Sequence, residues 1–189
     1  MMRIVFFLCV LMLSACATGG GTQTVTRALA PDVIIDIPER PIFEGGLDVV
    51  QLVQARYQDR HQMFQSFLHS DGNGLNVVMT VPSGPRIMRI VWGANGVATT
   101  REPIAPDELD AFHIIADLML VYAPLNELQN SISGAVVKDM ADGTRKILRN
   151  GKEVIVVQRP RQDRWDGSAR LENFSFDYVL NIQSQRVRQ

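Results

Sequence analysis

Three histidines and one aspartate are the side chains of this sequence best suited to acid–base chemistry. His61 and His69 lie eight residues apart in a segment that alternates like a β-strand, so they share one face but are too far apart for joint catalysis. His113 and Asp117 lie four residues apart in an apolar segment, and on a helix this spacing would allow a hydrogen-bonded pair. We interpret that pair as structural rather than catalytic.

The sequence motifs of common enzyme classes are absent. The chain has no G-x-S-x-G, no H-E-x-x-H, no phosphate-binding loop and no paired cysteines. We therefore expect a non-enzymatic protein without cofactor or metal, with a hydrolase or acyltransferase that uses His113 or His61 as the enzymatic alternative. The formal net charge of −1 gives no general reason to expect a nucleic-acid partner.

Cys16 has the clearest chemistry in the chain. It follows a short basic start, an apolar run at residues 4–13 and the residues Leu13, Ser14 and Ala15. This arrangement resembles the bacterial lipoprotein signal, which is cleaved before the cysteine once its thiol carries diacylglycerol. The apolar run is shorter than the roughly 20 residues that a membrane-spanning helix needs. The sequence therefore predicts removal of residues 1–15 and lipidation, including palmitate, at Cys16.

The residues after Cys16 predict the location of the protein and its domain organisation. Ala17 stands where an aspartate commonly retains lipoproteins in the inner membrane, so we expect an anchor in the outer membrane, on its periplasmic face. Two or more acyl chains hold a protein stably on a bilayer. Residues 16–30 are predicted to be the lipidated cysteine and a flexible tether, and residues 31–189 a single domain. Within it, residues 31–46 form either an edge strand or a segment that wraps the domain.

Residues 106–124 are predicted to form a buried helix. Pro106 suits a first helical turn, and acidic residues follow it, which favours the positive end of the helix dipole. From Phe112 onward only His113 and Asp117 interrupt the apolar surface, so the helix must be buried on nearly all sides. Pro124 is expected to stop it.

The rest of the chain is predicted to form antiparallel strands around this helix. Pairs such as Asn95-Gly96, Asp142-Gly143 and Asn150-Gly151 separate apolar runs, and they favour the positive φ angles of tight hairpin turns. Alternation places the even-numbered residues of 88–92 on one apolar face of their strand and the odd-numbered residues of 75–81 on one face of theirs. The expected strands are 48–58, 60–69, 75–81, 86–92, 97–101, 136–140, 145–149, 153–158 and 174–183, with a short helix at 124–132.

Four segments together resemble a domain-of-unknown-function family of bacterial lipoproteins, often encoded beside aryl-polyene or fatty-acid-like biosynthesis genes. They are PSGPR (82–86), IIADLMLVYAPLNEL (114–128), LRNGKEVIVV (148–157) and LENFSFDYVLNI (171–182). More distantly, the pattern is similar to the outer-membrane lipoprotein receptor LolB and its periplasmic carrier LolA. The resemblance implies an α+β, mostly β fold: an incomplete antiparallel β-barrel whose concave face is covered by a buried central helix.

A LolA/LolB-like fold implies a cavity for a hydrophobic ligand, such as a lipid, a lipoprotein acyl chain or a polyene-linked lipid. Flexible methionine side chains suit a cavity of this kind and suit an irregular packed core equally well. The residues that we expect around the ligand are Met79, Met88, Ile90, Trp92, Ile115, Met119 and Tyr122.

A basic segment near the C-terminus is a second candidate site. Arg159, Arg161 and Arg164 surround Trp165, and contact with anionic lipid head groups is the functional interpretation, against a simple solvated loop. The sequence thus predicts a lipid-anchored protein that binds or transfers a hydrophobic ligand. The alternative from another class is a non-enzymatic envelope assembly factor or scaffold that binds a protein partner through its surface.

Overall fold

A ten-stranded antiparallel sheet forms most of the molecule. The computed structural model describes residues 25–160 and 162–187, so the predicted signal peptide, Cys16 and Arg161 lie outside it. The strands of the large sheet are arranged in the order β7-β6-β5-β4-β3-β13-β12-β11-β10-β9. Their bounds are β3 (Leu47–Tyr57), β4 (Arg60–Ser70), β5 (Leu75–Thr80), β6 (Arg86–Gly93), β7 (Gly96–Arg101), β9 (Val136–Asp139), β10 (Arg145–Arg149), β11 (Lys152–Gln158), β12 (Gly167–Asn173) and β13 (Tyr178–Arg186).

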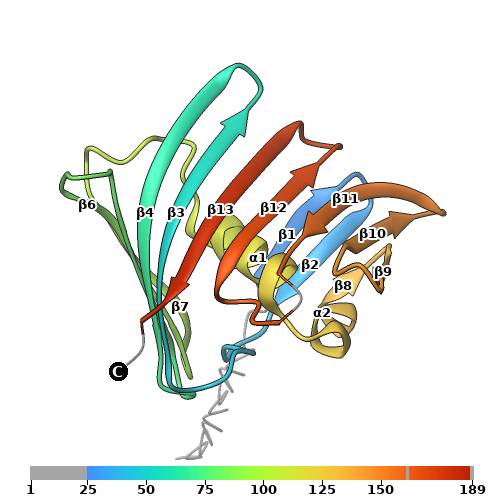
Figure 1. The fold of residues 1–189 in the computed structure, drawn as a ribbon, viewed down its shortest axis with the longest axis horizontal. Helices are drawn as coiled ribbons and strands as arrows, with labels where there is room; N and C mark the ends of the chain where they lie inside the picture. The colour runs from blue at the N-terminus through green and yellow to red at the C-terminus, as the bar shows by residue number, and fades with distance from the viewer. Residues whose placement is uncertain (1–24, 161, 188–189) are drawn as a thin grey trace, which may run out of the picture.

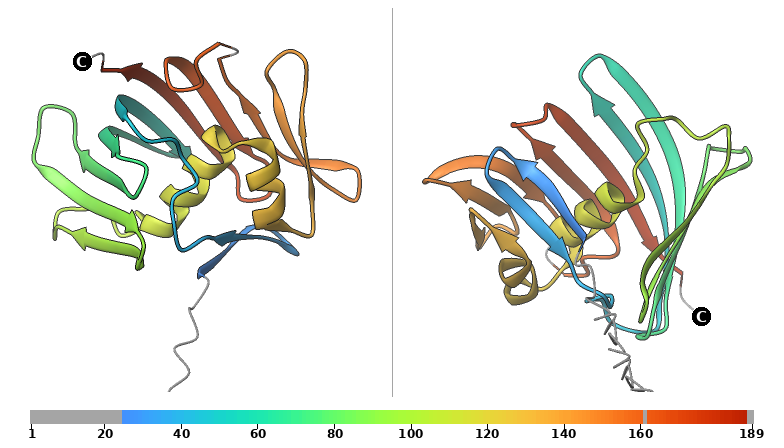
Figure 2. Two further views of the ribbon diagram at one scale, coloured as in Figure 1. Left: turned by 90° about the horizontal axis from the view of Figure 1, so that it is seen from below. Right: turned by 180° about the vertical axis from the view of Figure 1, so that it is seen from behind.

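The large sheet bends around the helix α1 (Ala111–Tyr122), which crosses its concave side (Figures 1 and 2). Strands β7 and β9 are the two edges and do not pair with each other, so the sheet is not closed into a barrel. A short helix, α2 (Leu125–Ser131), follows α1 directly. The prediction of an α+β, mostly β fold with an antiparallel sheet around a buried helix is confirmed.

A second, three-stranded sheet covers the other side of α1. It consists of β1 (Val25–Ala30), β2 (Val33–Ile37) and β8 (Ile132–Ser133), and both β1 and β2 contact α1. The predicted tether at residues 16–30 therefore needs correction, because its last six residues are a paired strand with Leu29 and Ala30 buried. Within residues 31–46, which the sequence left undecided, residues 33–37 form the central strand of this small sheet.

Helix α1 is buried on most of its surface, as predicted, but it begins later than predicted. The side chain of Asp110 accepts a hydrogen bond from the backbone N–H of His113 at 2.9 Å, so Asp110 caps the helix and Ala111 is its first residue. The predicted start at Pro106 is thus wrong by five residues. The helix ends at Tyr122, before Pro124, as expected from the proline. Neither helix in the described part of the chain is long and apolar enough to cross a membrane.

The turn and strand predictions succeed where the sequence alternates clearly. Asn150 and Gly151 have φ angles of 51° and 78°, which are the two positive values that a type I′ hairpin turn requires. The inward side chains of β5 and the predicted face of β6 are buried. One expected strand, 174–183, begins only at Tyr178, and the whole of β12 was not predicted.

Candidate functional site

The seven residues that were expected around a ligand lie in the packed core. Met79, the most accessible of them, is 4% exposed, and Trp92 and Ile115 are 0% exposed. Helix α1 fills the space that the bent sheet encloses, so these side chains contact one another and the helix. Their contact with a ligand stays a prediction, and it would require the core to open. The full set is Met79, Met88, Ile90, Trp92, Ile115, Met119 and Tyr122.

An apolar cleft of about 720 Å³ lies elsewhere, beneath the β3–β4 hairpin at one end of the molecule. This volume is within the ~300–1,000 Å³ that is typical of small-molecule sites. Four segments form its walls: the end of β3, the start of β4, the face of α1 with the residues before it, and the β12–β13 turn with the start of β13. The lining includes Ala55, Tyr57, Phe64, Leu109, Phe176 and Leu180 among its apolar and aromatic members.

Strand register brings the sheet walls of this cleft together. Ala55 on β3 is directly opposite Leu180 on β13, and Tyr57 is opposite Tyr178. Ala55 is likewise opposite Gln62 on β4. Because residues two apart on a strand share a face, these side chains line the same concave surface.

Glu108, Asp117 and Asp177 are the acidic residues of the cleft lining, and Asp117 is the one that lies on α1. Asp117, on α1, lies in the lining, and the hydroxyl of Tyr178 donates a hydrogen bond to its Oδ1 at 2.7 Å. Burial raises the pKa of Asp117 to about 7, although the hydrogen bond from Tyr178 acts in the opposite direction. Burial, together with the neighbouring Asp117, raises the pKa of Tyr178 well above its ordinary value. The cleft therefore contains a carboxyl group that changes charge near neutral pH.

The predicted pair between His113 and Asp117 does not form. His113 lies one turn nearer the helix start, its side chain is 55% exposed, and its Nδ1 is 3.6 Å from Oδ1 of Asp110. Asp117 bonds instead with Tyr178 of β13. The residue predicted to be its structural partner, His113, is therefore replaced in this role by Tyr178.

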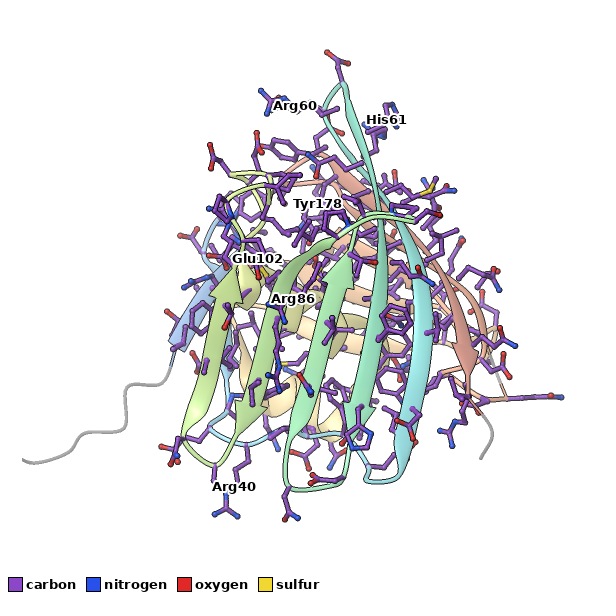
Figure 3. The ribbon with its side chains drawn as sticks, turned by 90° about the vertical axis from the view of Figure 1, so that its left-hand side faces the viewer. Arg40, Arg60, His61, Arg86, Glu102 and Tyr178 are labelled. Atoms are coloured by element: carbon purple, nitrogen blue, oxygen red, sulfur yellow. The ribbon has the colours of Figure 1, made fainter. Side chains whose placement is uncertain are left out.

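Ion pairs lie at the mouth of the cleft. Arg60 pairs with Glu108, and Arg56 is 3.5 Å from Asp177, so each bridge joins two different walls. Arg60 and His61 project at the tip of the hairpin and point to opposite sides of it, with Tyr178 below them (Figure 3). His61 is exposed, away from the interior.

The basic segment near the C-terminus stabilises the end of helix α1. Arg145, Arg159 and Arg164 donate to the carbonyl oxygens of residues 120, 121 and 122 at 3.0, 3.4 and 2.8 Å. These carbonyls have no partner within the helix, and positive charge is favourable at this end of the helix dipole. The predicted head-group contacts by Arg159 and Arg164 would therefore compete with structural bonds.

Two other members of the predicted head-group site have different positions. Trp165 is 1% exposed and stacks on Tyr122 with ring centroids 4.0 Å apart, so its side chain belongs to the core. Arg161 lies outside the described residues. Arg159 and Arg164 border a second surface hollow of about 720 Å³, but it is lined largely by charged and polar groups.

Among residues 25–160 and 162–187, no group of three or more histidine, cysteine and acidic side chains is placed to hold a metal ion. Of the two histidines of the enzymatic alternative, His113 lies 3.6 Å from the carboxylate of Asp110 and His61 is exposed near the tip of the hairpin.

The sequence of this chain matches a known protein family. A family described as "Protein of unknown function (DUF3261)" matches residues 48–186, which is most of the chain. The chain belongs to the DUF3261 family. No curated protein matches it. Every residue that lines the cleft lies inside the matched DUF3261 region, whereas β1 and β2 precede it.

The sequence contains a pattern that indicates this site. Leu109, His113 and Asp117 recur at intervals of four residues, and all three line the cleft. In the helix predicted over residues 106–124, a row of this kind that contains two polar side chains indicates the side where the burial is interrupted. In the structure His113 and Asp117 lie on α1, and Leu109 precedes it.

Proposed function

We propose that this DUF3261 protein is an outer-membrane lipoprotein, anchored through Cys16, that binds or passes on a hydrophobic ligand in the cleft beneath the β3–β4 hairpin. The observation that carries the proposal is the apolar lining of a 720 Å³ cleft at the surface. Candidate ligands are a lipid, a lipoprotein acyl chain or a polyene-linked lipid. We also propose a distant LolA/LolB-like relation, in which an incomplete barrel carries an acyl chain, with the difference that α1 fills the middle of the barrel and the ligand lies at one end.

The lining of the cleft suits a chain-like ligand. Apolar surface exposed in a concave site gains about 0.8 kcal/mol for each methylene group of a ligand that it buries. A longer alkyl chain should therefore bind about fourfold more tightly for each added methylene until the cleft is filled. Tyr57 and Phe176 remain 46% and 36% exposed at the cleft, so they are available to cover such a chain.

The test is displacement of a fluorescent fatty-acid analogue from the mature chain carrying Cys16→Ser, which prevents the protein's own acyl groups from competing. Ala55→Trp places a large ring in the cleft and should abolish binding. Gln54→Trp is the matched control, because the adjacent residue of β3 is exposed on the other face of the sheet. Absence of binding by the wild-type cleft, or equal binding by both variants, would refute the proposal.

The convex face of the sheet supports the second candidate, a scaffold that binds a protein partner. Leu52, Phe67 and Val91 are 38–42% exposed there, on strands β3, β4 and β6. Exposed apolar groups of this kind often mark interaction surfaces. If Phe67→Ser disrupted the protein's cellular role while the variant kept its stability and its probe binding, the scaffold function would be favoured.

A further inference from the structure

Asp117 is in an unusual position for a carboxyl group. It lies on a helix whose other inward side chains are apolar apart from the hydroxyl of Tyr122, and it borders the cleft with the apolar residues Phe64, Leu109 and Leu180. Among the described residues, the hydroxyl of Tyr178 donates a hydrogen bond to this group, and the accepting atom is Oδ1 of Asp117. The carboxyl group therefore retains acceptor capacity on the side of the cleft.

A polar group in apolar surroundings is unfavourable unless its hydrogen bonds are complete. The protein avoids this elsewhere on the same helix, where Tyr122 is satisfied by Gln51 at 2.8 Å and by Ser184 at 2.9 Å. At Asp117 a donor on a molecule in the cleft can bond to the second carboxyl oxygen.

We propose that Asp117 recognises the polar end of the ligand, and that this ligand is a single apolar chain bearing a hydrogen-bond donor, with a primary amine preferred. This inference rests on the proposed function, since it assumes that the cleft holds an apolar chain. The chain would lie against Phe64, Leu109 and Leu180 while the amine donates to the carboxyl group.

The charges at the cleft favour an amine over an anionic head group. The two arginines of the lining are engaged, Arg60 with Glu108 and Arg56 with Asp177. A carboxylate or phosphate would meet arginines whose charge is already balanced and would also face Asp117. A protonated amine meets neither obstacle.

The experiment compares dodecylamine, dodecanol and dodecanoate as competitors of a neutral apolar fluorophore, phenylnaphthylamine, bound to the mature chain with Cys16→Ser. At pH 8 we expect dodecylamine to compete at about tenfold lower concentration than dodecanoate, the difference expected for one charge-assisted hydrogen bond. Asp117→Asn preserves an acceptor for Tyr178 and should abolish the preference for the amine over dodecanol and dodecanoate.

A pH series provides a readout that a purely structural aspartate would not change. The preference for the amine should grow as the pH rises from 6 to 8, because burial raises the pKa of Asp117 to about 7 and the ammonium group needs the ionised form. The other ionisable groups of the lining are Arg56, Tyr57, Arg60, Glu108, His113, Asp177 and Tyr178. His113 is the histidine of this lining, so His113→Gln is the control and should keep the trend.

The outcomes separate the two proposals. If phenylnaphthylamine does not bind to the wild-type chain, the proposed function itself fails. Three other outcomes would leave the binding of apolar chains intact but would overturn the role of Asp117. They are equal competition by the three compounds, a preference for dodecanoate, and a preference for the amine that persists in Asp117→Asn.

Discussion

Replacing Asp117 by asparagine should make the folded protein more stable at pH 8 than the wild type. An ordinary aspartate in the unfolded chain has a pKa of about 3.9, whereas burial raises the pKa of Asp117 to about 7 in the folded protein. The full difference between these two pKa values corresponds to about 4 kcal/mol in the free energy of unfolding. Because the side chain of Asp117 keeps some contact with water in the cleft, we expect Asp117→Asn to raise the free energy of unfolding by about 2–4 kcal/mol.

The sign of the effect follows from the two protonation states. Below about pH 4 the carboxyl group of Asp117 is protonated in both the folded and the unfolded chain. The wild type and Asp117→Asn then both carry a neutral side chain at position 117. Between pH 4 and 7 the folded protein holds a proton that the unfolded chain has released, so the stability of the wild type falls as the pH rises. Above pH 7 the ionised group is fully unfavourable, and asparagine avoids that loss while still accepting from Tyr178.

Urea unfolding of both proteins at pH 4 and pH 8 measures this difference directly. The advantage of Asp117→Asn should grow by about 2–4 kcal/mol between the two pH values. Asp107→Asn, at a fully exposed side chain, is the control and should change stability by less than about 0.5 kcal/mol at both. An advantage that does not depend on pH would show that Asp117 has an ordinary pKa and would refute the argument from burial.

Four further substitutions test the anchor and the core. Cys16→Ser should abolish palmitate labelling and release the protein from membrane fractions, and equal labelling would contradict the lipoprotein signal. Met119→Asp buries a carboxylate at a 0% exposed position and should reduce the free energy of unfolding by several kcal/mol, whereas Asn126→Asp on exposed α2 should be neutral. Ile90→Trp should overpack the core by about 1–3 kcal/mol, and wild-type stability with altered probe binding would instead indicate a cavity. Arg145→Met should cost about 1–3 kcal/mol in chemical denaturation because it leaves the carbonyl of Leu120 without its buried donor, whereas Asp139 keeps Arg159 as a partner; wild-type stability would contradict that role.

Most strands could be predicted from the sequence because their apolar residues alternate and glycine-containing turns separate them. β12 was missed because its sequence, GSARLEN, has only Ala169 and Leu171 as apolar inward residues, and charged residues occupy its outer face. β1 was mistaken for part of the tether because it follows a run of small, uncharged residues and contains Thr26 and Arg27. In both strands the pairing with a neighbour, rather than local composition, determines the structure.

The candidate site could not be predicted because its contacts join distant parts of the chain. Tyr178 is 61 residues from Asp117, and the arginines that stabilise the end of α1 are 25, 38 and 42 residues from the carbonyls that they contact. The helical spacing correctly placed His113 and Asp117 on one face, but another strand supplied the better partner. Sequence periodicity indicates which side of an element is buried, and it does not indicate which element covers it.

Two polar side chains of α1 differ in how many hydrogen-bond partners they have, and this difference favours the cleft as the functional region. At the C-terminal end, Tyr122 bonds with the buried Gln51 and Ser184, and three arginines bind the last carbonyls. Midway along the helix, Asp117 has Tyr178 as its partner among the described residues and borders the apolar cleft, where a valine or leucine would pack more favourably. A group that lowers stability where packing alone would do better is best explained by a ligand that completes its hydrogen bonds. The increased stability expected for Asp117→Asn and its expected loss of preference for an amine are therefore two measurements of the same carboxyl group.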